Sequence, residues 1–488
     1  MNKEITGLYP KRVWRYFAEI LEIPRPSKKE EQIIAYLMEF GRKKGLELSR
    51  DDTGNLLIRK PPSDGFEDAP TVVLQSHVDM VGEKNSDVRH DFEKDPIKAY
   101  IDGPWVKAQG TTLGADDGIG IAAQLAILES ENIGHGPIEC LFTVDEETGL
   151  TGAFGLKPGW LKGAVLINLD SEDEGELFIG CAGGVDTLGR ITPERDEAPS
   201  GWKAMKVSIS GLIGGHSGDD IHKGRANAVK LINRFLWNAS GKYGIQVSEM
   251  RGGNLRNAIA REAFSVFCYD PEHEKELLGY VREFSGICRS EYSITEPGMK
   301  IGSEETEIPD RVLKWGLQEK LLHSIYACPH GVHAWSSEIP GFVETSTNLA
   351  SVILENDEIV ITTSQRSSVE SAKKDIRDMV ASALHLGGAE VDHSEGYPGW
   401  TPNPDSIIVK VTADSYRRLF NTEPKVLAIH AGLECGLIGS VYPDMDMISI
   451  GPTIKGAHSP DERLDIKTVG KFWDLLLDVL KKVPEAYK

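Results

Sequence analysis

The first third of the chain alternates between two hydrophobic patterns. Apolar residues recur at helical spacing in two segments, 29–45 and 116–132. Short apolar runs mark four further segments as strands: 55–60, 71–80, 138–147 and 164–173. Strands that alternate with helices in this way predict an α/β domain in which helices cover a central sheet.

The end of the chain returns to the same pattern. Residues 425–432 and 445–452 are typical of strands, and residues 466–483 have the apolar spacing of an amphipathic helix. These segments would complete the α/β domain that the first part of the chain begins.

Two glycine-rich stretches, 180–185 and 396–400, separate these parts from a middle region, and such stretches are typical of hinges or linkers. We therefore expect a discontinuous domain formed by residues 1–183 and 397–488. Residues 184–396 would form a second domain inserted into it.

The middle region combines strands and helices in a repeated order. A strand pattern at 205–211 precedes a helix pattern at 227–240, and further strand patterns lie near 255–268. Residues 254–267 and 348–361 both begin with Asn-Leu and continue with alternating apolar positions, which is a weak internal repeat. This order predicts an α+β domain of two βαββαβ-like units.

Length and charge narrow the class of protein. The 488 residues exceed what one hydrophobic core usually holds, which favours two or more domains. The 54 Lys and Arg residues against 75 Asp and Glu residues give a net charge of −21, which disfavours nucleic acid and anionic membranes as partners. The sequence has neither a signal peptide nor a stretch of about 18 apolar residues, so we expect a cytoplasmic protein.

The six cysteines are scattered and form no CxxC pair. In a chain of this length they are expected to be reduced thiols rather than a disulfide framework or a cysteine zinc site. They are Cys140, Cys181, Cys268, Cys288, Cys328 and Cys435.

The apolar run VLQSHVDM (73–80) ends with a histidine and a carboxylate, His77 and Asp79. Alternate strand residues point to one face, so these two side chains would project the same way. An imidazole that hands its second N–H to a carboxylate is common around metals. Taken alone, the stretch also fits a strand end with two solvated polar residues.

Acidic and histidine residues also follow the other expected strands. In open α/β sheets, functional groups gather at the carboxyl ends of strands, so these residues are expected to meet. They are Asp116 and Asp117 at a helix start, Glu146 and Glu147 past one strand, Asp170 past another, and His458 in a loop after the last strand.

Two histidines with several carboxylates suit zinc, cobalt or manganese better than calcium, because imidazole is a borderline nitrogen donor. The number of side chains is enough for two metals that share a carboxylate. Such an arrangement would leave one carboxylate free to act as a general base.

These motifs together resemble the M20 family of dinuclear zinc peptidases. The stretches are SHVDMV, GADDGIG, DEETGL, NLDSED and GAHSPDE, which occur in this order along nearly the whole chain. The AGLECG stretch (431–436) and the motif spacing resemble the aminoacyl-histidine (Xaa-His, carnosinase-like) dipeptidase branch. The resemblance implies a zinc-peptidase-like catalytic domain with a mixed central sheet, interrupted by a lid domain.

The resemblance implies a role for each residue of the site. His77 and Asp170 would bind one zinc, Glu147 and His458 the other, and Asp116 would bridge them. Asp79 would orient His77, and Glu146 would be the general base. A cis peptide bond between Asp116 and Asp117 is also implied.

The resemblance further assigns substrate-binding residues, mostly to the lid. His216 would polarise the scissile carbonyl, and Arg366 would bind the substrate carboxylate, to which a guanidinium group is well suited. Asn257 and Gly432 are further candidates. The implied activity is hydrolysis of dipeptides, including β-alanyl-histidine, with two Zn²⁺ ions that Co²⁺ or Mn²⁺ could replace, in a homodimer formed through the lid.

Several alternatives compete with this interpretation. GIGIAA (118–123) matches a dinucleotide-binding motif, but two acids precede it where a pyrophosphate would bind. GGHSGD (214–219) lacks the G-x-S-x-G pattern of a serine hydrolase. Another M20-type amidohydrolase or aminoacylase would share the site, whereas a non-catalytic metal-binding scaffold would not need Glu146.

Overall fold

The structure is a computed structural model that describes residues 2–355, 358–403, 405–430 and 432–488. The chain forms two compact units. Unit 1 comprises Met1–Gly180, Trp400–Ala428 and Leu433–Lys488, and unit 2 comprises Cys181–Gly399 and Ile429–Gly432. The boundaries expected from glycine-rich stretches lie within a few residues of these, but no sequence pattern indicated that Ile429–Gly432 joins unit 2.

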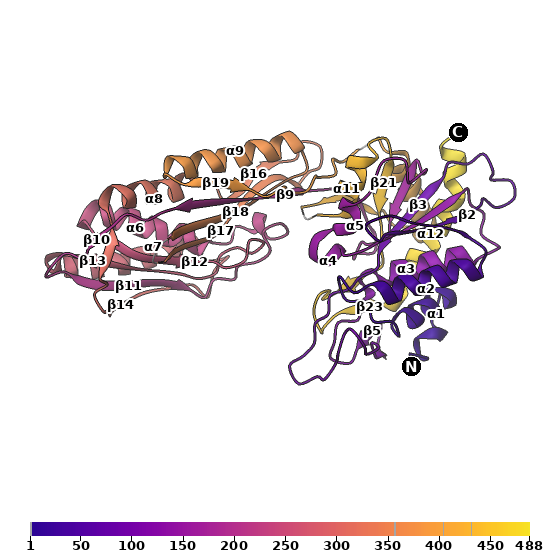
Figure 1. Ribbon diagram of the computed structural model, residues 1–488, viewed down its shortest axis with the longest axis horizontal. Helices are drawn as coiled ribbons and strands as arrows, with labels where there is room; N and C mark the ends of the chain where they lie inside the picture. The colour runs from indigo at the N-terminus through magenta and orange to yellow at the C-terminus, as the bar shows by residue number, and fades with distance from the viewer. Residues whose placement is uncertain (1, 356–357, 404, 431) are drawn as a thin grey trace. The chain divides into compact units, whose positions relative to one another are not determined.

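Unit 1 is built on a mixed sheet whose strand order is β1-β2-β6-β3-β7-β21-β8-β20 (Figure 1). Four neighbouring strands, β6, β3, β7 and β21, run parallel, so their carboxyl ends meet at one edge. The strands are β1 (Glu47–Arg50), β2 (Leu56–Lys60), β3 (Val72–His77), β6 (Ile138–Thr143), β7 (Val165–Asn168), β8 (Glu176–Cys181), β20 (Lys425–Ile429) and β21 (Asp446–Ser449).

Helices and a small second sheet complete unit 1. Helix α3 packs on β3 and α1, and α10 packs on α12 and β21. The helices are α1 (Lys11–Ile20), α2 (Glu31–Lys43), α3 (Ala115–Glu129), α4 (Glu146–Gly149), α5 (Thr151–Phe154), α10 (Ile407–Phe420), α11 (Glu434–Val441) and α12 (Ile466–Ala486). The small sheet joins β4 (Ala99–Asp102), β5 (Trp105–Ala108), β22 (Ile454–Lys455) and β23 (Arg463–Asp465).

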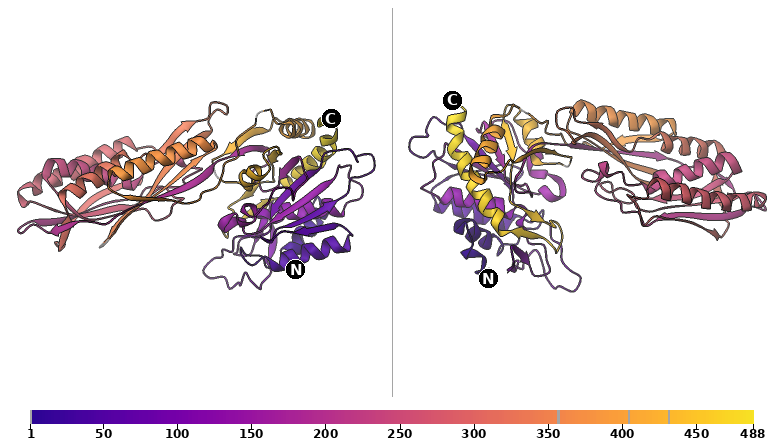
Figure 2. Two further views of the ribbon diagram at one scale, coloured as in Figure 1. Left: turned by 45° about the horizontal axis from the view of Figure 1, so that its top comes forward. Right: turned by 180° about the vertical axis from the view of Figure 1, so that it is seen from behind.

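Unit 2 contains a nine-stranded antiparallel sheet with the order β14-β11-β13-β12-β17-β18-β9-β19, and β16 pairs with β17. Helices α6–α9 pack together on one face of it and share one apolar core with its strands (Figure 2). Two short strands, β10 (Arg195–Glu197) and β15 (Arg311–Leu313), form a separate pair.

The remaining strands and helices of unit 2 follow in chain order. They are β9 (Gly183–Ile191), β11 (Lys203–Ser210), α6 (Ala228–Tyr243), β12 (Gln246–Gly252), β13 (Ala263–Tyr269), α7 (Glu274–Glu291), β14 (Lys300–Thr306), α8 (Trp315–Ala327), β16 (Gly331–Trp335), β17 (Val343–Glu355), β18 (Glu358–Ser367), α9 (Glu370–Leu386) and β19 (Glu390–His393).

Two βαββαβ arrangements make up the large sheet of unit 2. The first is β11-α6-β12-β13-α7-β14, and the second is β9-α8-β17-β18-α9-β19. In both, the spatial order of the strands is fourth, first, third, second. The first arrangement is inserted after the opening strand of the second, which the sequence did not indicate.

Two of the expected strands were longer than the observed ones. The strand expected near 255–268 begins only at Ala263, because residues 254–262 form a loop. The strand expected at 138–147 ends at Thr143, and Glu146 begins a short helix. The internal repeat matches β13 with β18, but Asn254 lies in a loop whereas Asn348 lies inside β17.

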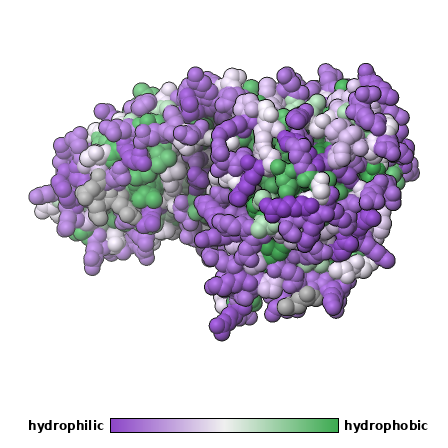
Figure 3. Space-filling model, turned by 45° about the vertical axis from the view of Figure 1, so that its right-hand side comes forward, coloured by the Kyte–Doolittle hydropathy of each residue, from purple (hydrophilic) through white to green (hydrophobic). Residues whose placement is uncertain are grey.

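Apolar side chains fill the interiors, and most of the visible surface in Figure 3 is hydrophilic with smaller hydrophobic patches. All six cysteines are buried and free of disulfides, as expected. Among the described residues, no helix has the length and apolar character needed to cross a membrane.

Candidate active site

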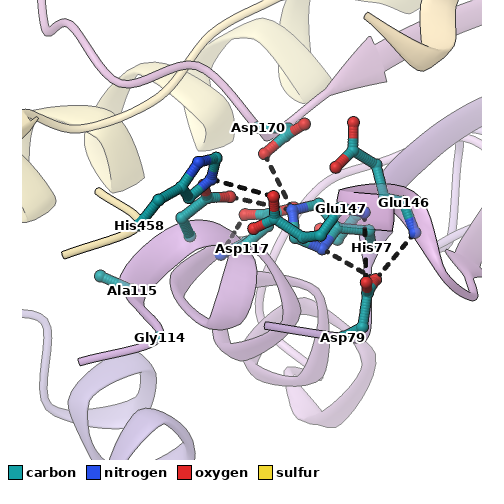
Figure 4. A network of polar contacts seen from close by, with 12 residues as sticks. His77, Asp79, Gly114, Ala115, Asp117, Glu146, Glu147, Asp170 and His458 are labelled. Atoms are coloured by element: carbon teal, nitrogen blue, oxygen red, sulfur yellow. Dashed lines mark hydrogen bonds and ion pairs between the residues drawn. The ribbon is translucent and has the colours of Figure 1, made fainter. Parts of the chain in front are cut away.

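The parallel strands of unit 1 bring the chemically active side chains to one edge of the sheet (Figure 4). His77 ends β3 and Asp79 follows it, Glu146 and Glu147 open α4 beyond β6, and Asp170 follows β7. Asp116 lies in the first turn of α3, and His458 lies in the loop between β22 and β23.

Asp116 lies between two imidazoles. Its Oδ1 is 2.9 Å from His77 Nε2, and its Oδ2 is 3.1 Å from His458 Nε2. The peptide bond between Asp116 and Asp117 is cis, as the resemblance implied. Each oxygen of this carboxylate therefore faces a different histidine.

Two groups of ligand atoms share Asp116. His77, Asp116 and Asp170 form one group, and Asp116, Glu147 and His458 form the other, with the ligand atoms of each group within 4.8 Å of one another. His77 Nε2 lies 3.4 Å from Asp170 Oδ1, and His458 Nε2 lies 2.9 Å from Glu147 Oε2. Both groups combine nitrogen and oxygen donors.

Burial and charge compete at these side chains. Burial disfavours the charged form of His77, but the carboxylates of Asp170 and Asp116 outweigh it and raise its pKa well above the ordinary value. Hydrogen bonds to Asp116 and Glu147 raise the pKa of His458 to about 11. Burial alone would raise the pKa of Asp116, but the two imidazoles lower it far below its usual range.

Burial raises the pKa of Glu146 well above its ordinary value, with His77 opposing and the charges of Glu434 and Glu147 adding to the effect. Burial likewise raises the pKa of Asp170 strongly. The raised pKa values of these acids and of both imidazoles reflect an excess of negative charge in the site. Divalent cations would balance that charge.

The donor set fits metal ions. Glu147 Oε1 is buried and has no hydrogen-bond partner among the described residues, so a ligand atom is available. Imidazole nitrogens with carboxylate oxygens suit zinc and similar first-row metals. His77, Asp170, Glu147 and His458 would hold two ions, with Asp116 shared between them.

Asp79 connects a histidine to the following helix. Its Oδ1 lies 3.3 Å from His77 Nδ1 and accepts the backbone N–H of Glu146 at 3.0 Å. Its Oδ2 accepts the Glu147 N–H at 3.2 Å and the Ser27 hydroxyl at 2.8 Å. Burial would raise the pKa of Asp79, but these contacts lower it. One carboxylate thus orients an imidazole and holds the start of α4.

Sequence reasoning missed two residues that hold the loop before Asp116. Glu462 accepts the backbone N–H groups of Leu113 (2.7 Å), Gly114 (3.0 Å) and Ala115 (2.7 Å). The buried guanidinium group of Arg25 donates to the carbonyl of Gly114 and to that of Asp79 at 2.5 and 2.6 Å. Glu462 is the last residue of the GAHSPDE motif, which was the only sequence signal for it. No sequence pattern marks Arg25.

Two of the candidates in unit 2 are neighbours, and the other two lie beside the same tyrosine, Tyr397. His216 forms a β-bridge with Ala258, and the Ser217 N–H donates to the carbonyl of Asn257 at 2.8 Å, so His216 and Asn257 are neighbours. Arg366 Nη1 donates to Tyr397 Oη at 3.1 Å. This places Arg366 beside an aromatic hydroxyl that the sequence did not single out.

Tyr397 also lies against Gly432, where an added Cβ would come within 2.9 Å of its ring. Asp219 lies close to both His216 and Arg366, because a hydrogen bond with His216 and the charge of Arg366 lower its pKa. Ala431, the first residue of the AGLECG stretch, lies outside the described residues. The four candidates of unit 2 therefore belong to one polar region of that unit.

The dinucleotide-like stretch has a different role. Gly118–Ala123 lie inside α3, and a Cβ on Gly120 would come within 2.6 Å of Ser76 Oγ. Gly120 thus allows α3 to approach β3 closely. The glycines serve helix packing rather than a phosphate-binding turn.

Known proteins resemble this chain over almost its whole length. The model of Peptidase family M20/M25/M40 matches residues 73–482. The cytosol non-specific dipeptidase of Escherichia coli (strain K12) is 43% identical over 481 residues, which cover 99% of each chain.

Two solved structures extend the likeness to the fold. The crystal structure of aminoacylhistidine dipeptidase from Vibrio alginolyticus has a TM-score of 0.92 and 44% identity, with 98% of each chain covered. A tripeptidase from Staphylococcus aureus shares the fold at a TM-score of 0.58 and 17% identity, with 98% of this chain and 99% of the other covered.

Proposed function

The chain belongs to peptidase family M20/M25/M40, and from this we propose that it is a metal-dependent dipeptidase. The observation that carries the proposal is the pair of ligand groups that share Asp116, with Glu146 beside them. The E. coli relative is a non-specific dipeptidase, and the Vibrio relative is an aminoacylhistidine dipeptidase. Both names support dipeptides as the substrate class.

We propose two Zn²⁺ ions as the cofactors, with Co²⁺ or Mn²⁺ able to replace them. When bound, such a pair polarises the scissile carbonyl and lowers the pKa of the attacking water. His77 and Asp170 would hold one ion, and Glu147 and His458 the other. The N/O donor set supports this choice without distinguishing among the three metals.

Glu146 is proposed as the general base. Burial raises the pKa of its carboxyl group above the ordinary value, which strengthens it as a proton acceptor. It would take a proton from the attacking water and deliver it to the leaving amine. Asp79 would hold Glu146 in place through the backbone N–H while orienting His77.

Unit 2 is proposed to act as the substrate-binding lid. Arg366 would bind the substrate carboxylate, and His216 would donate to the carbonyl oxygen on which negative charge develops. Asn257 and Gly432 are proposed to contribute polar contacts. Support comes from the family resemblance and from the location of all four in one polar region of unit 2.

A substrate panel tests the proposal. The purified protein would be assayed with β-alanyl-histidine, other Xaa-His dipeptides, dipeptides without histidine, a tripeptide and N-acetyl amino acids, each with and without chelator. Chelator-sensitive hydrolysis of dipeptides is the expected result, with Xaa-His among the preferred substrates. Exclusive cleavage of N-acetyl amino acids would instead identify an aminoacylase, and inactivity after metal loading would indicate a scaffold.

We further propose a cytoplasmic location and a homodimer formed through unit 2. The E. coli relative, whose name places it in the cytosol, supports the first proposal. The second follows from the family resemblance. Light scattering on the intact chain and on a variant with charged substitutions on unit 2 would test the assembly.

A further inference from the structure

A chain of buried polar side chains crosses the four parallel strands just below the metal-ligand groups. One residue comes from each strand: Thr143 (β6), Gln75 (β3), Asn168 (β7) and Ser449 (β21). Polar side chains are costly in a sheet interior unless each is hydrogen-bonded. All four have no exposed surface, and they are linked to one another.

The hydrogen bonds of this chain lead toward Glu434, with one additional bond from Gln75 Nε2 to Thr143 Oγ1 at 3.1 Å. The Ser449 hydroxyl donates to Asn168 Oδ1 at 2.5 Å, and Asn168 Nδ2 donates to Gln75 Oε1 at 2.6 Å. Gln75 Nε2 then donates to Glu434 Oε2 at 2.6 Å. The Thr143 hydroxyl donates to the same oxygen at 2.7 Å.

Glu434 is therefore the terminal acceptor of the chain. It is the first residue of α11 and is fully buried. Its second oxygen, Oε1, has no hydrogen-bond partner among the described residues. A buried carboxyl group with two donors on one oxygen and none on the other is costly, and a role beyond packing would account for it.

The chain is connected to the candidate active site through the backbone. Gln75 precedes His77 by two residues on β3, so both side chains project from the same face of the strand. Asn168 precedes Asp170 by two residues, and its Oδ1 also lies 3.4 Å from the Asp170 backbone nitrogen. Gln75 and Asn168 thus support the ends of β3 and β7, where His77 and Asp170 lie.

We propose that Glu434 is a positioning residue, which sets the location of His77 and Asp170 by terminating the hydrogen-bond chain through Gln75 and Asn168. The inference rests on the proposed metal-dependent function. Without the acceptor, the Gln75 amide group keeps only its longer hydrogen bond to Thr143 Oγ1, at 3.1 Å, and the amide orientations along the hydrogen-bond chain are less firmly fixed. The ligands of one metal would then lose their alignment.

The choice of variants separates hydrogen bonding from charge. Glu434→Gln can keep an acceptor oxygen toward Gln75 and Thr143, with its NH₂ group in the place of Oε1. Glu434→Leu removes the acceptor. Gln75→Leu interrupts the chain one step nearer to His77 and serves as a second variant if Glu434→Leu does not fold.

Metal binding would be measured by competition titration with Zn²⁺ and by the absorption spectrum of the Co²⁺-loaded protein. Removal of an outer group that orients ligands typically costs 10–100-fold in metal affinity. We expect a loss of about that size and an altered Co²⁺ spectrum in Glu434→Leu and Gln75→Leu, with Glu434→Gln close to wild type. A variant that combines Glu434→Leu with Gln75→Leu should bind Zn²⁺ no more weakly than the more impaired of the two single variants, because both substitutions interrupt the same hydrogen-bond chain.

A control separates positioning from stability. Gln318→Leu removes another buried amide, in unit 2, that donates to Ser240 Oγ and to the Ile245 carbonyl at 2.8 Å each. It should lower Tm without changing Zn²⁺ affinity. Wild-type affinity in Glu434→Leu would overturn the proposal, as would a Glu434→Gln variant as impaired as Glu434→Leu. Metal affinity and the Co²⁺ spectrum are measured without substrate. If the protein hydrolysed no dipeptide, the proposed function would be contradicted, and this test of Glu434 would still be valid.

Discussion

The Asp79 carboxylate accepts the backbone N–H of Glu146, with 3.0 Å between Asp79 Oδ1 and the Glu146 nitrogen. The same oxygen lies 3.3 Å from His77 Nδ1. A metal ligand on one strand and the proposed general base on the next helix are therefore held by one carboxylate. Movement of this group would displace both.

Asp79→Asn should impair both metal binding and turnover. The asparagine NH₂ group would face a backbone N–H of Glu146 or Glu147, so at least one buried donor loses its acceptor, at a cost of about 1–3 kcal/mol. We expect about a 10–100-fold loss of Zn²⁺ affinity, as for other groups that orient metal-binding histidines. Ser27→Ala, which removes only the hydroxyl donor to Asp79 Oδ2, should have a smaller effect. Equal effects in the two variants would argue against a specific role of the carboxylate.

Glu146→Gln should abolish turnover while metal binding persists. Its side chain is proposed to move protons, and removal of a general base typically costs 10²–10⁴-fold. We expect kcat to fall by about this factor, with the Zn²⁺ content measured by mass spectrometry unchanged. Glu146→Asp, which keeps the carboxylate on a shorter side chain, should retain partial activity. A fully active Glu146→Gln variant would rule out this residue as the base.

Some of the residues that the sequence marked directly follow an apolar run. His77 and Asp170 could be recognised in this way, because a polar residue at a strand end interrupts a clear pattern. The parallel order of the strands then brings them together. Fold class and candidate ligands were thus accessible from short segments.

Supporting residues could not be recognised, because their partners are distant in sequence. Glu462 holds backbone groups at 113–115, and Glu434 accepts from Gln75 and Thr143, roughly 300 residues or more before it. Backbone N–H groups carry no sequence signal. The same reason explains why the inserted first βαββαβ arrangement of unit 2 was not anticipated, since β9 pairs with β18 far along the chain.

Metal binding should release protons and strengthen with pH. Without metal, the pKa of His458 is raised to about 11 by Asp116 and Glu147, so this imidazole is protonated at pH 7, and the carboxylates around His77 raise its pKa and favour its protonated form. In the metal-free protein, the stabilisation from charged His458 is complete below its unfolded pKa near 6.5 and is lost as the pH rises toward 11. Metal ligation requires neutral imidazole, so binding must displace these protons.

Calorimetric titration with Zn²⁺ in buffers of different ionisation enthalpy measures this release. Affinity should rise about tenfold per pH unit for each proton released. The His458→Asn variant should release one proton fewer and show a shallower pH dependence. Affinity that is constant between pH 6 and 8 would contradict the coupling of metal and proton binding.

Arg366→Met should weaken substrate binding rather than turnover. A charge-assisted hydrogen bond contributes about 1.5–3 kcal/mol, so loss of the guanidinium group should raise KM roughly 10–100-fold for dipeptides with a free carboxylate. C-terminally amidated dipeptides should be poor substrates for wild type and variant alike. Tyr397→Phe, which removes the hydroxyl that Arg366 contacts at 3.1 Å, should raise KM less. Unchanged discrimination between free and amidated substrates in Arg366→Met would assign the carboxylate to another residue.

Glu462→Gln should loosen the loop that carries Asp116. Glu462 Oε1 accepts from Ala115 at 2.7 Å and lies 3.4 Å from the Asp116 nitrogen, while Oε2 accepts from Leu113 and Gly114. A glutamine NH₂ group would face backbone N–H donors in place of one of the two oxygens, so part of the loop would lose its acceptor. We expect lower Tm together with weaker Zn²⁺ binding.

Glu139→Gln provides the matched control in the same unit. Glu139 is also a buried carboxylate that accepts two backbone N–H groups, from Lys162 at 2.8 Å and Gly163 at 3.0 Å, and its ion-pair partner is Arg59 rather than a residue of the candidate site. Both substitutions should lower Tm because each leaves a buried donor without its acceptor. Only Glu462→Gln should also lower Zn²⁺ affinity, because only its loop carries the carboxylate shared by His77 and His458. Equal Zn²⁺ affinity in both variants would mean that Glu462 stabilises the fold without positioning Asp116.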